Sequence, residues 1–87
     1  MKGFAEIDKL FQAFPMEWFR ITTIAKYGRV TAPHARSILA VMIEHGQVQA
    51  KKMPQKHAQA TFYGASEANR KRYALRNQKS NRKILAG

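Results

Sequence analysis

The stretch IAKYGRVTAPHARSILAVMIEHGQV, residues 24–48, contains the clearest helix boundaries in the chain. Thr31 has a side chain that caps helices, and Pro33 follows within the first turn, where proline is tolerated. Apolar residues then recur at helical spacing until Gly46, which predicts a helix over residues 31–45. Its expected buried stripe is formed by Ala35, Ile38, Leu39, Met42 and Ile43.

A short helix over residues 22–28, TTIAKYG, is expected before this one. Thr22 or Thr23 would accept a hydrogen bond from the free amides of its first turn, and Gly28 suits its C-terminal end. Because the segment is short, tertiary packing must hold it in the helical state.

The N-terminal segment FAEIDKLFQAF, residues 4–14, places its large apolar residues on one helical face. We expect Pro15 to end this helix, because proline disfavours the helical conformation in the residue before it. The next segment, MEWFRI, residues 16–21, predicts a short strand that buries Trp18 or Phe19; continuation into the next helix is the alternative. The expected apolar face of the first helix consists of Phe4, Ile7, Leu10, Phe11 and Phe14.

A β-hairpin is predicted after Gly46. Residues 47–52 alternate in polarity, with Val48 and Ala50 on one face, MPQKHA (53–58) is a plausible loop, and QATFYGA (59–65) is a second strand. The remaining segment, residues 66–87, begins with Ser66 as a possible cap. We expect it to be helical to about Gln78 and then to become a mobile basic end.

The charge of the chain is large and uneven. Sixteen Lys and Arg face five Asp and Glu, a formal net charge of +11. Residues 47–87 hold ten of the basic groups and one of the acidic groups, a net +9. Such a field favours polyanions. Nucleic acid is preferred over a membrane surface, because the basic segment has only scattered apolar residues and no broad apolar helix face.

The order helix, strand, helix, turn, helix, hairpin over residues 4–64 resembles winged helix-turn-helix DNA-binding domains. The resemblance is carried by the Ile-Ala pair at 24–25, the Val-Thr pair at 30–31, and the apolar helix closed by Gly46. It implies a mainly α fold with a small β-hairpin, in which three helices and a wing (residues 1–65) precede a basic C-terminal extension (66–87). The usual turn glycine is displaced by one residue to Gly28, which leaves Arg29 in its place.

The resemblance implies sequence-specific binding of double-stranded DNA by a regulator of transcription, with the helix at 31–45 in the major groove. Arg36 is the first candidate for a base contact, followed by His34 and Ser37. Contacts to the DNA backbone are expected from Thr31, Lys26, Arg29 and, in the loop of the wing, Lys51, Lys52, Gln55, Lys56 and His57. The extension would add nucleic-acid contacts through Arg70, Lys71, Arg72, Arg76, Lys79, Arg82 and Lys83.

Several alternatives stay open at this level. Arg36 could solvate the helix or touch only phosphate, and the lysines of the wing could simply protect a hairpin edge. Val41 and Ile43 favour burial against the N-terminal helix over a partner surface. The chain could instead be an adaptor that binds a protein, or could bind RNA or coat DNA nonspecifically through its tail. A homodimer is possible, although no long apolar C-terminal helix is evident.

Other classes of function find little support. The five carboxylates offer no evident acid–base pair, so we expect no enzyme activity. The three histidines, His34, His45 and His57, match no zinc spacing, and there is no cysteine, so no metal or cofactor is expected. Acidic residues near the N-terminus argue against a secretory signal, and no apolar run is long enough to span a membrane. We expect a cytoplasmic protein, associated with the nucleoid if it is bacterial or from a phage.

Overall fold

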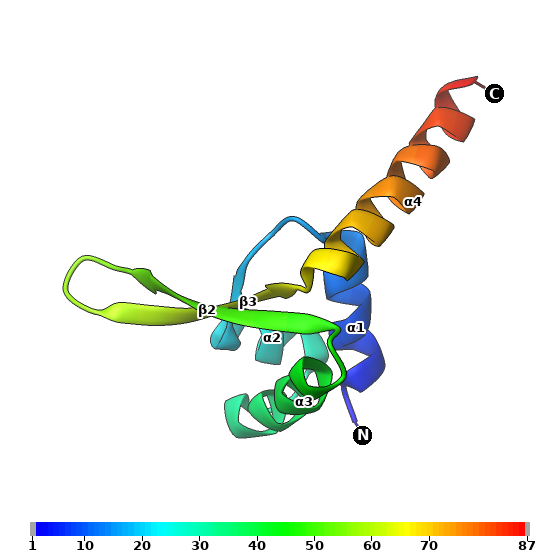
Figure 1. Cartoon of the computed structure of the whole chain (residues 1–87). Coiled ribbons are helices and arrows are strands. Elements are labelled where there is room, and N and C mark those ends of the chain that lie inside the picture. The colour runs from blue at the N-terminus through cyan, green and yellow to red at the C-terminus, as the bar shows by residue number, and fades with distance from the viewer. Residues whose placement is uncertain (1, 87) are drawn as a thin grey trace.

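The computed structural model describes the backbone of residues 2–86 and the side chains of residues 2–77. In this part of the chain, four helices surround a small antiparallel sheet (Figure 1), which confirms the predicted mainly α class with a hairpin. The elements in chain order are α1 (Phe4–Ala13), β1 (Phe19–Arg20), α2 (Ile21–Gly28), α3 (Ala32–Glu44), β2 (Val48–Pro54), β3 (Gln59–Ala65) and α4 (Glu67–Ala86).

The N-terminal helix α1 ends before Pro15, as predicted. It buries Ile7, Leu10 and Phe11 in the core. The prediction that Phe14 belongs to the same buried face is wrong. Phe14 lies just after the helix and is 51% exposed, with its ring edge-on to Phe19 at a centroid distance of 6.5 Å. Once the chain leaves the helix at Ala13, helical spacing no longer sets the direction of the next side chain.

The strand β1 is only two residues long and passes directly into α2. The prediction that Thr22 or Thr23 caps α2 is wrong, because the helix begins at Ile21. Its N-cap is Arg20, whose side chain makes no capping hydrogen bond. The entry of the chain from the sheet therefore fixes the start of this helix, and both threonines are exposed within its first turn.

The helix α3 has the capping that its sequence predicts. The Thr31 hydroxyl oxygen accepts a hydrogen bond from the His34 amide at 3.3 Å, and proline occupies the first turn. Ile43, however, is 41% exposed and Val41 is half-buried, so the expected burial of Ile43 is wrong. Ile43 is the last apolar residue before α3 ends at Glu44, and at this end of the helix the core covers Met42 but not its neighbour. The buried residues are Ala35, Ile38, Leu39 and Met42.

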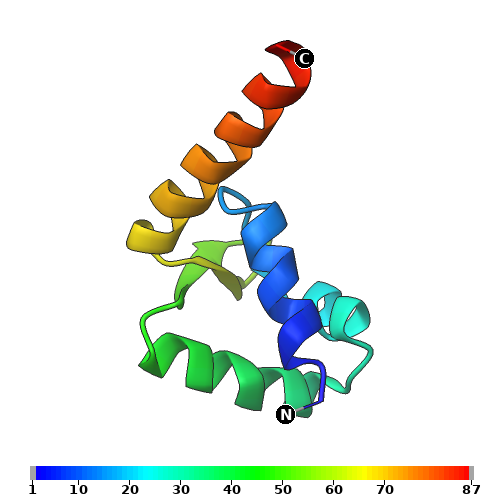
Figure 2. The ribbon, with the colours of Figure 1, turned by 90° about the vertical axis from the view of Figure 1, so that its right-hand side faces the viewer.

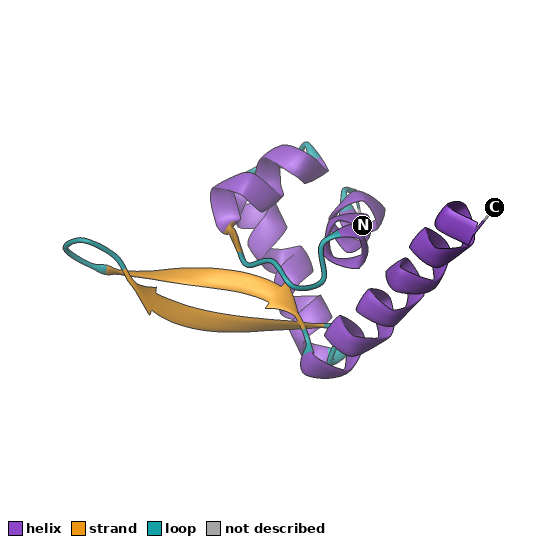
Figure 3. Ribbon diagram, turned by 90° about the horizontal axis from the view of Figure 1, so that it is seen from above, coloured by secondary structure: helices purple, strands orange, loops and turns teal. Residues whose placement is uncertain are grey.

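The sheet has the strand order β1-β3-β2, and β2 and β3 form a long hairpin that extends from the body (Figure 3). The register pairs Val48 with Ala65 at the base and Pro54 with Gln59 near the tip. The second strand has the predicted bounds, but the first extends to Pro54, so the loop is shorter than expected. Val48 is buried and Ala50 is exposed. The core therefore contacts only the base of the hairpin.

The C-terminal helix α4 begins at a cap, as expected, because the Ser66 hydroxyl oxygen accepts a hydrogen bond from the Asn69 amide at 3.3 Å. The helix is longer than the prediction of an end near Gln78, and continues to Ala86. Its first part packs against α1, where Arg76 and Asn77 donate hydrogen bonds to the Gln12 side chain and carbonyl at 3.2 and 3.3 Å. Figure 2 shows its second half projecting away from the other elements.

Within residues 2–86, no helix combines the length needed to cross a membrane with sufficient apolar character. The 20-residue α4 has the length, but its sequence is strongly basic.

Candidate nucleic-acid interface

The outer face of α3 is the first element of the candidate interface. Its inner face is anchored in the core, which leaves Arg36 and Ser37 exposed. Ser37 donates a hydrogen bond from its hydroxyl to the Pro33 carbonyl at 3.2 Å, so its oxygen remains available as an acceptor. Arg36 therefore presents the longest and most versatile donor on this face.

His34 is held by a contact that the sequence did not indicate. Its Nε2 lies 2.9 Å from the carbonyl oxygen of Lys2, which fixes the imidazole toward the N-terminal segment. A carbonyl oxygen can only accept, so this contact places the proton on Nε2. A base contact by His34 would use Nδ1 or require this hydrogen bond to break.

The turn before α3 gathers positive charge. Arg29 has a left-handed backbone with φ 56°, the only positive φ at a residue other than glycine among the described residues. Its amide donates to Lys26 at 3.2 Å, and the Val30 amide donates to Ala25 at 3.0 Å, which closes the end of α2. A hollow of about 370 Å³ next to the turn is lined by Lys2, Arg29, Val30, Thr31 and His34.

The wing carries basic residues on both of its faces. Lys51 pairs with Phe62 and Lys52 with Thr61, so consecutive lysines point to opposite sides of the hairpin. Both residues lie in β2, and the prediction that they belong to the loop is wrong because the strand pairing continues to Pro54. The exposed tip contains Gln55, Lys56 and His57.

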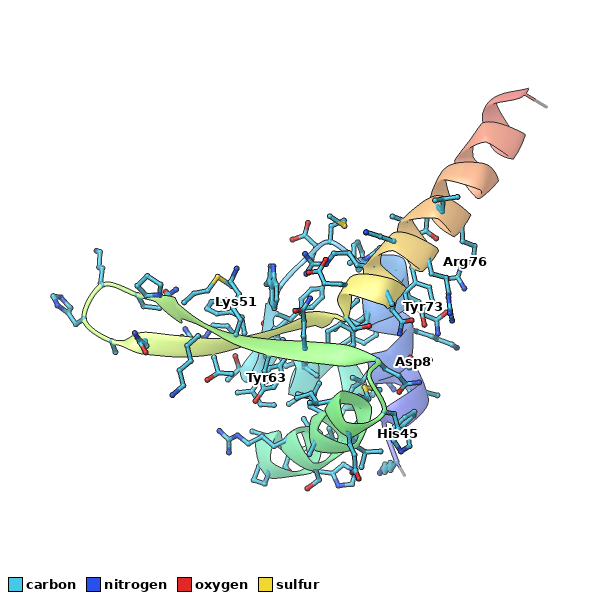
Figure 4. All side chains as sticks on the ribbon, in the orientation of Figure 1. Asp8, His45, Lys51, Tyr63, Tyr73 and Arg76 are labelled. Carbon is cyan, nitrogen blue, oxygen red and sulfur yellow. The ribbon has the colours of Figure 1, made fainter. Side chains whose placement is uncertain are left out.

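Lys51 is on the sheet face that is turned away from α3. Its Nζ lies 4.8 Å from the centroid of the Trp18 ring. Figure 4 shows Lys51 and Tyr63 on opposite sides of the sheet, with Tyr63 toward α3. Lys52, one residue further on, is therefore the strand lysine that shares a side of the sheet with α3.

A second hollow separates α3 from the wing. It measures about 270 Å³ and combines residues from three parts of the chain. Arg36 comes from α3, Arg20 from β1, and the polar side chains of Gln59 and Thr61 from β3. Arg20 only borders the hollow: it pairs with Phe62, and its guanidinium lies over that ring, 5.9 Å from the centroid, on the sheet face that also carries Lys51. This hollow links the proposed recognition helix to the wing in one continuous surface.

The basic residues of α4 with described side chains do not join this surface. Arg70 lies over the Trp18 ring at 4.8 Å, and Arg76 lies over the Tyr73 ring at 5.0 Å while donating to Gln12. Lys71 and Arg72 are exposed on α4, which extends away from the side that carries α3 and the wing tip (Figure 1). The side chains of Lys79, Arg82 and Lys83 lie outside the described residues.

Sequence reasoning missed Lys2 as a member of this surface and Arg20 as a residue at the border of the second hollow. Lys2 comes close to Arg29 and His34 only because α1 packs on α2, and Arg20 reaches the hollow only through the pairing of β1 with β3. The only local signal was their positive charge. The described residues contain no group of three or more His, Asp or Glu side chains placed to hold a metal ion.

The comparisons with known proteins assign the fold. No protein-family model matches the sequence, and no curated protein matches it significantly. Among solved structures, a possible transcriptional regulator from Methanosarcina mazei Go1 is similar with a TM-score of 0.67 and 14% identity, over 99% of this chain and 73% of that one. A mutant of S. aureus MepR is similar with a TM-score of 0.65 and 10% identity, over 99% and 64%.

A mutant of Lactococcus lactis ZitR is similar with a TM-score of 0.62 and 9% identity, over 94% of this chain and 57% of that one. At such low identities the likeness is one of fold. The chain has the winged helix-turn-helix fold, in which α2 and α3 form the helix-turn-helix and β2 and β3 form the wing, as the sequence resemblance implied.

Proposed function

We propose that this protein binds double-stranded DNA sequence-specifically and regulates transcription. The observation that carries the proposal is the placement of Arg36, exposed on α3 beside a hollow that continues into a basic wing. An α-helix fits the major groove, and an arginine there can donate two hydrogen bonds to the O6 and N7 atoms of guanine. The description of the M. mazei protein as a possible transcriptional regulator supports the regulatory role.

The remaining basic residues of this side would position the protein on the DNA backbone. Lys2, Lys26 and Arg29 flank the start of α3, where the free amides also favour phosphate. In the wing, Lys52 and Lys56 would reach a neighbouring phosphate or the minor groove. Contacts of this kind set the register of the complex and carry no sequence information of their own.

The positions of the described α4 side chains argue against two alternatives, RNA binding and nonspecific coating of DNA. Binding of RNA or nonspecific coating of DNA would depend on the basic residues of α4, yet Arg70 and Arg76 are engaged with Trp18 and Gln12. Among the α4 residues with described side chains, Lys71 and Arg72 remain, on the side away from α3. These positions favour a binding mode led by α3 and the wing, and the proposal requires no catalytic step or cofactor.

The test is a selection of duplexes from a random pool, followed by titration of the selected duplex and a scrambled one at about 50 mM and about 200 mM salt. We expect the wild-type protein to prefer the selected duplex at both salt concentrations. Arg36→Ala should lose that preference, with a cost of about 1–3 kcal/mol on the selected duplex. Arg72→Ala, which removes the same charge from α4, should retain the preference. Equal binding of all duplexes by the wild-type protein would contradict the proposal.

A further inference from the structure

An apolar groove lies between the α1–β1 connection and α4. It has a volume of about 440 Å³, and its apolar walls are Met16, Ala74 and Leu75. Met16 is 60% exposed and Leu75 is 56% exposed. Two large aliphatic side chains thus face solvent across one hollow, whereas Ile43, the other exposed large aliphatic residue with a described side chain, lies on α3 outside it. Such a feature marks a binding surface more often than a scattered single exposed residue does.

The groove is remote from the proposed DNA interface. It is formed where α4 leaves the body, on the side away from α3 and from the tip of the wing (Figure 1). A duplex held by α3 and the wing would therefore leave the groove open. Its occupant has to be a different molecule or a different part of an assembly.

The rim of the groove is basic. Arg70 and Lys71 line it, and a neighbouring hollow on the other side of Leu75 is lined by Lys71, Arg72 and Arg76. Glu67 is the one carboxylate in the two linings. The Nε and Nη2 atoms of Arg70 are buried beside Trp18 and make no hydrogen bond within the described residues. The solvent-exposed positive charge of the rim therefore comes from Lys71, Arg72 and Arg76. An occupant with carboxylates would match this rim.

We propose that this groove binds an acidic amphipathic segment of a partner protein, whose apolar side chains contact Met16 and Leu75 and whose carboxylates pair with the arginine and lysine rim. This is the helix-in-groove mode of peptide recognition, in which one face of the peptide supplies apolar anchors. The rim would add specificity and speed of association more than affinity.

The two competing occupants fit less well. A second copy of this chain would bring the basic rim of one α4 against that of another, and like charges brought together oppose association. A single-stranded nucleic acid would use aromatic side chains as stacking platforms, whereas the apolar walls of this groove are aliphatic. An acidic protein segment satisfies both the apolar walls and the charge.

The test is a selection of displayed random 12-residue peptides on the full chain, followed by anisotropy titration of one enriched peptide. Enriched peptides should combine large aliphatic residues with Asp and Glu. Leu75→Ser and Lys71→Glu should each weaken the enriched peptide at least tenfold. Ile43→Ser, which changes another exposed aliphatic residue outside the groove, should bind it like the wild type. Far-UV circular dichroism checks that the variants are folded, and Met16→Ser gives a second apolar variant outside the helices.

Three results would overturn the proposal. The first is a set of enriched peptides without acidic and aliphatic bias, or binding that is equal in Leu75→Ser and the wild type. The second is a dimer, measured by sedimentation, that Leu75→Ser dissociates. The third is tight binding of a 12-nucleotide RNA that Lys71→Glu abolishes and Leu75→Ser does not change. Loss of duplex binding by Arg36→Ala is a separate result, so failure of the DNA proposal is distinguishable from failure of this one.

Discussion

The guanidinium of Arg70 lies over the indole ring of Trp18, 4.8 Å from its centroid, and joins the start of α4 to the connection between α1 and β1. Lys51 of the wing lies over the same ring at 4.8 Å. Trp18 therefore connects three segments that are distant in sequence, the connection after α1, the wing and α4. An arginine or lysine over a tryptophan face is attracted by the ring as well as packed against it.

Replacing Trp18 should loosen all three segments. Trp18→Ala is expected to lower the free energy of unfolding by about 3 kcal/mol, because it removes a half-buried ring and two cation–π contacts. Tyr27 is another aromatic residue and is 48% exposed. Tyr27→Ala should lower the free energy of unfolding by less than about 1 kcal/mol, as is usual for surface positions. Urea unfolding followed by far-UV circular dichroism compares the two. A cost for Trp18→Ala no greater than that for Tyr27→Ala would contradict the role given to Trp18.

Gly64 lies close against the same ring and leaves no room for a side chain. A Cβ added there would lie 3.0 Å from Cε3 of Trp18, 3.2 Å from the Glu17 carbonyl oxygen and 3.2 Å from Nη2 of Arg70. Gly64→Ala should therefore destabilise the protein by about 1–3 kcal/mol, the usual range for overpacking. In a Trp18→Ala background the same change should cost less, because one of the three contacts is gone. Equal costs in the two backgrounds would show that the ring is not the obstacle.

Arg29 occupies a left-handed position that glycine adopts more readily. Arg29→Gly should raise the free energy of unfolding by about 0.5–1 kcal/mol, since it relieves the positive φ of 56°. Under the proposed function, the same change should weaken duplex binding, because it removes a backbone contact. Arg29→Ala is the matched control, which loses the charge and keeps the strain. Thermal unfolding should show stabilisation by Arg29→Gly and no gain for Arg29→Ala, and duplex titration should show similar losses of affinity for the two variants. Stabilisation by both variants would contradict the explanation.

Thr31 caps the helix that carries Arg36. Thr31→Ala should lower the free energy of unfolding by about 1 kcal/mol, because the His34 amide loses its acceptor, and Thr31→Ser should retain most of the stability. Chemical denaturation of the two variants measures the difference. If serine were as destabilising as alanine, the methyl group of Thr31 and not its hydroxyl would be responsible.

Much of the fold was predictable because local rules determine it. Pro15 ends α1, Thr31 begins α3, and the β-forming residues Thr61, Phe62 and Tyr63 mark the second strand of the wing. These signals act over a few residues, where steric and hydrogen-bonding preferences dominate. The exposure of Ile43 was not predictable in this way, since periodicity identifies an apolar face without saying which other element covers it.

The candidate site was predictable only in part. Arg36 could be placed on the outer face of α3 from the helix period, because the buried stripe defines the opposite side. The residues that surround Arg36 in the structure could not be predicted from the sequence. Arg20 reaches the hollow through strand pairing, and Arg70 stacks on a tryptophan 52 positions earlier in the chain. Contacts over such sequence separations depend on the whole fold and leave no local signal. For this reason Arg70 and Arg76 were expected to contact nucleic acid, although in the structure they contact Trp18 and Gln12.

The proposed function is tested by asking whether the guanidinium of Arg36 contacts N7 of one particular guanine. In the selected duplex, each guanine is replaced in turn by 7-deazaguanine, which lacks the N7 acceptor, and affinity is measured for the wild-type protein and for Arg36→Ala. The account predicts that one replacement weakens the wild type by about 1–3 kcal/mol and leaves Arg36→Ala unchanged, because the arginine reads that guanine. If every replacement affected the two proteins equally, Arg36 would not contact a base, and α3 would not read the DNA through it.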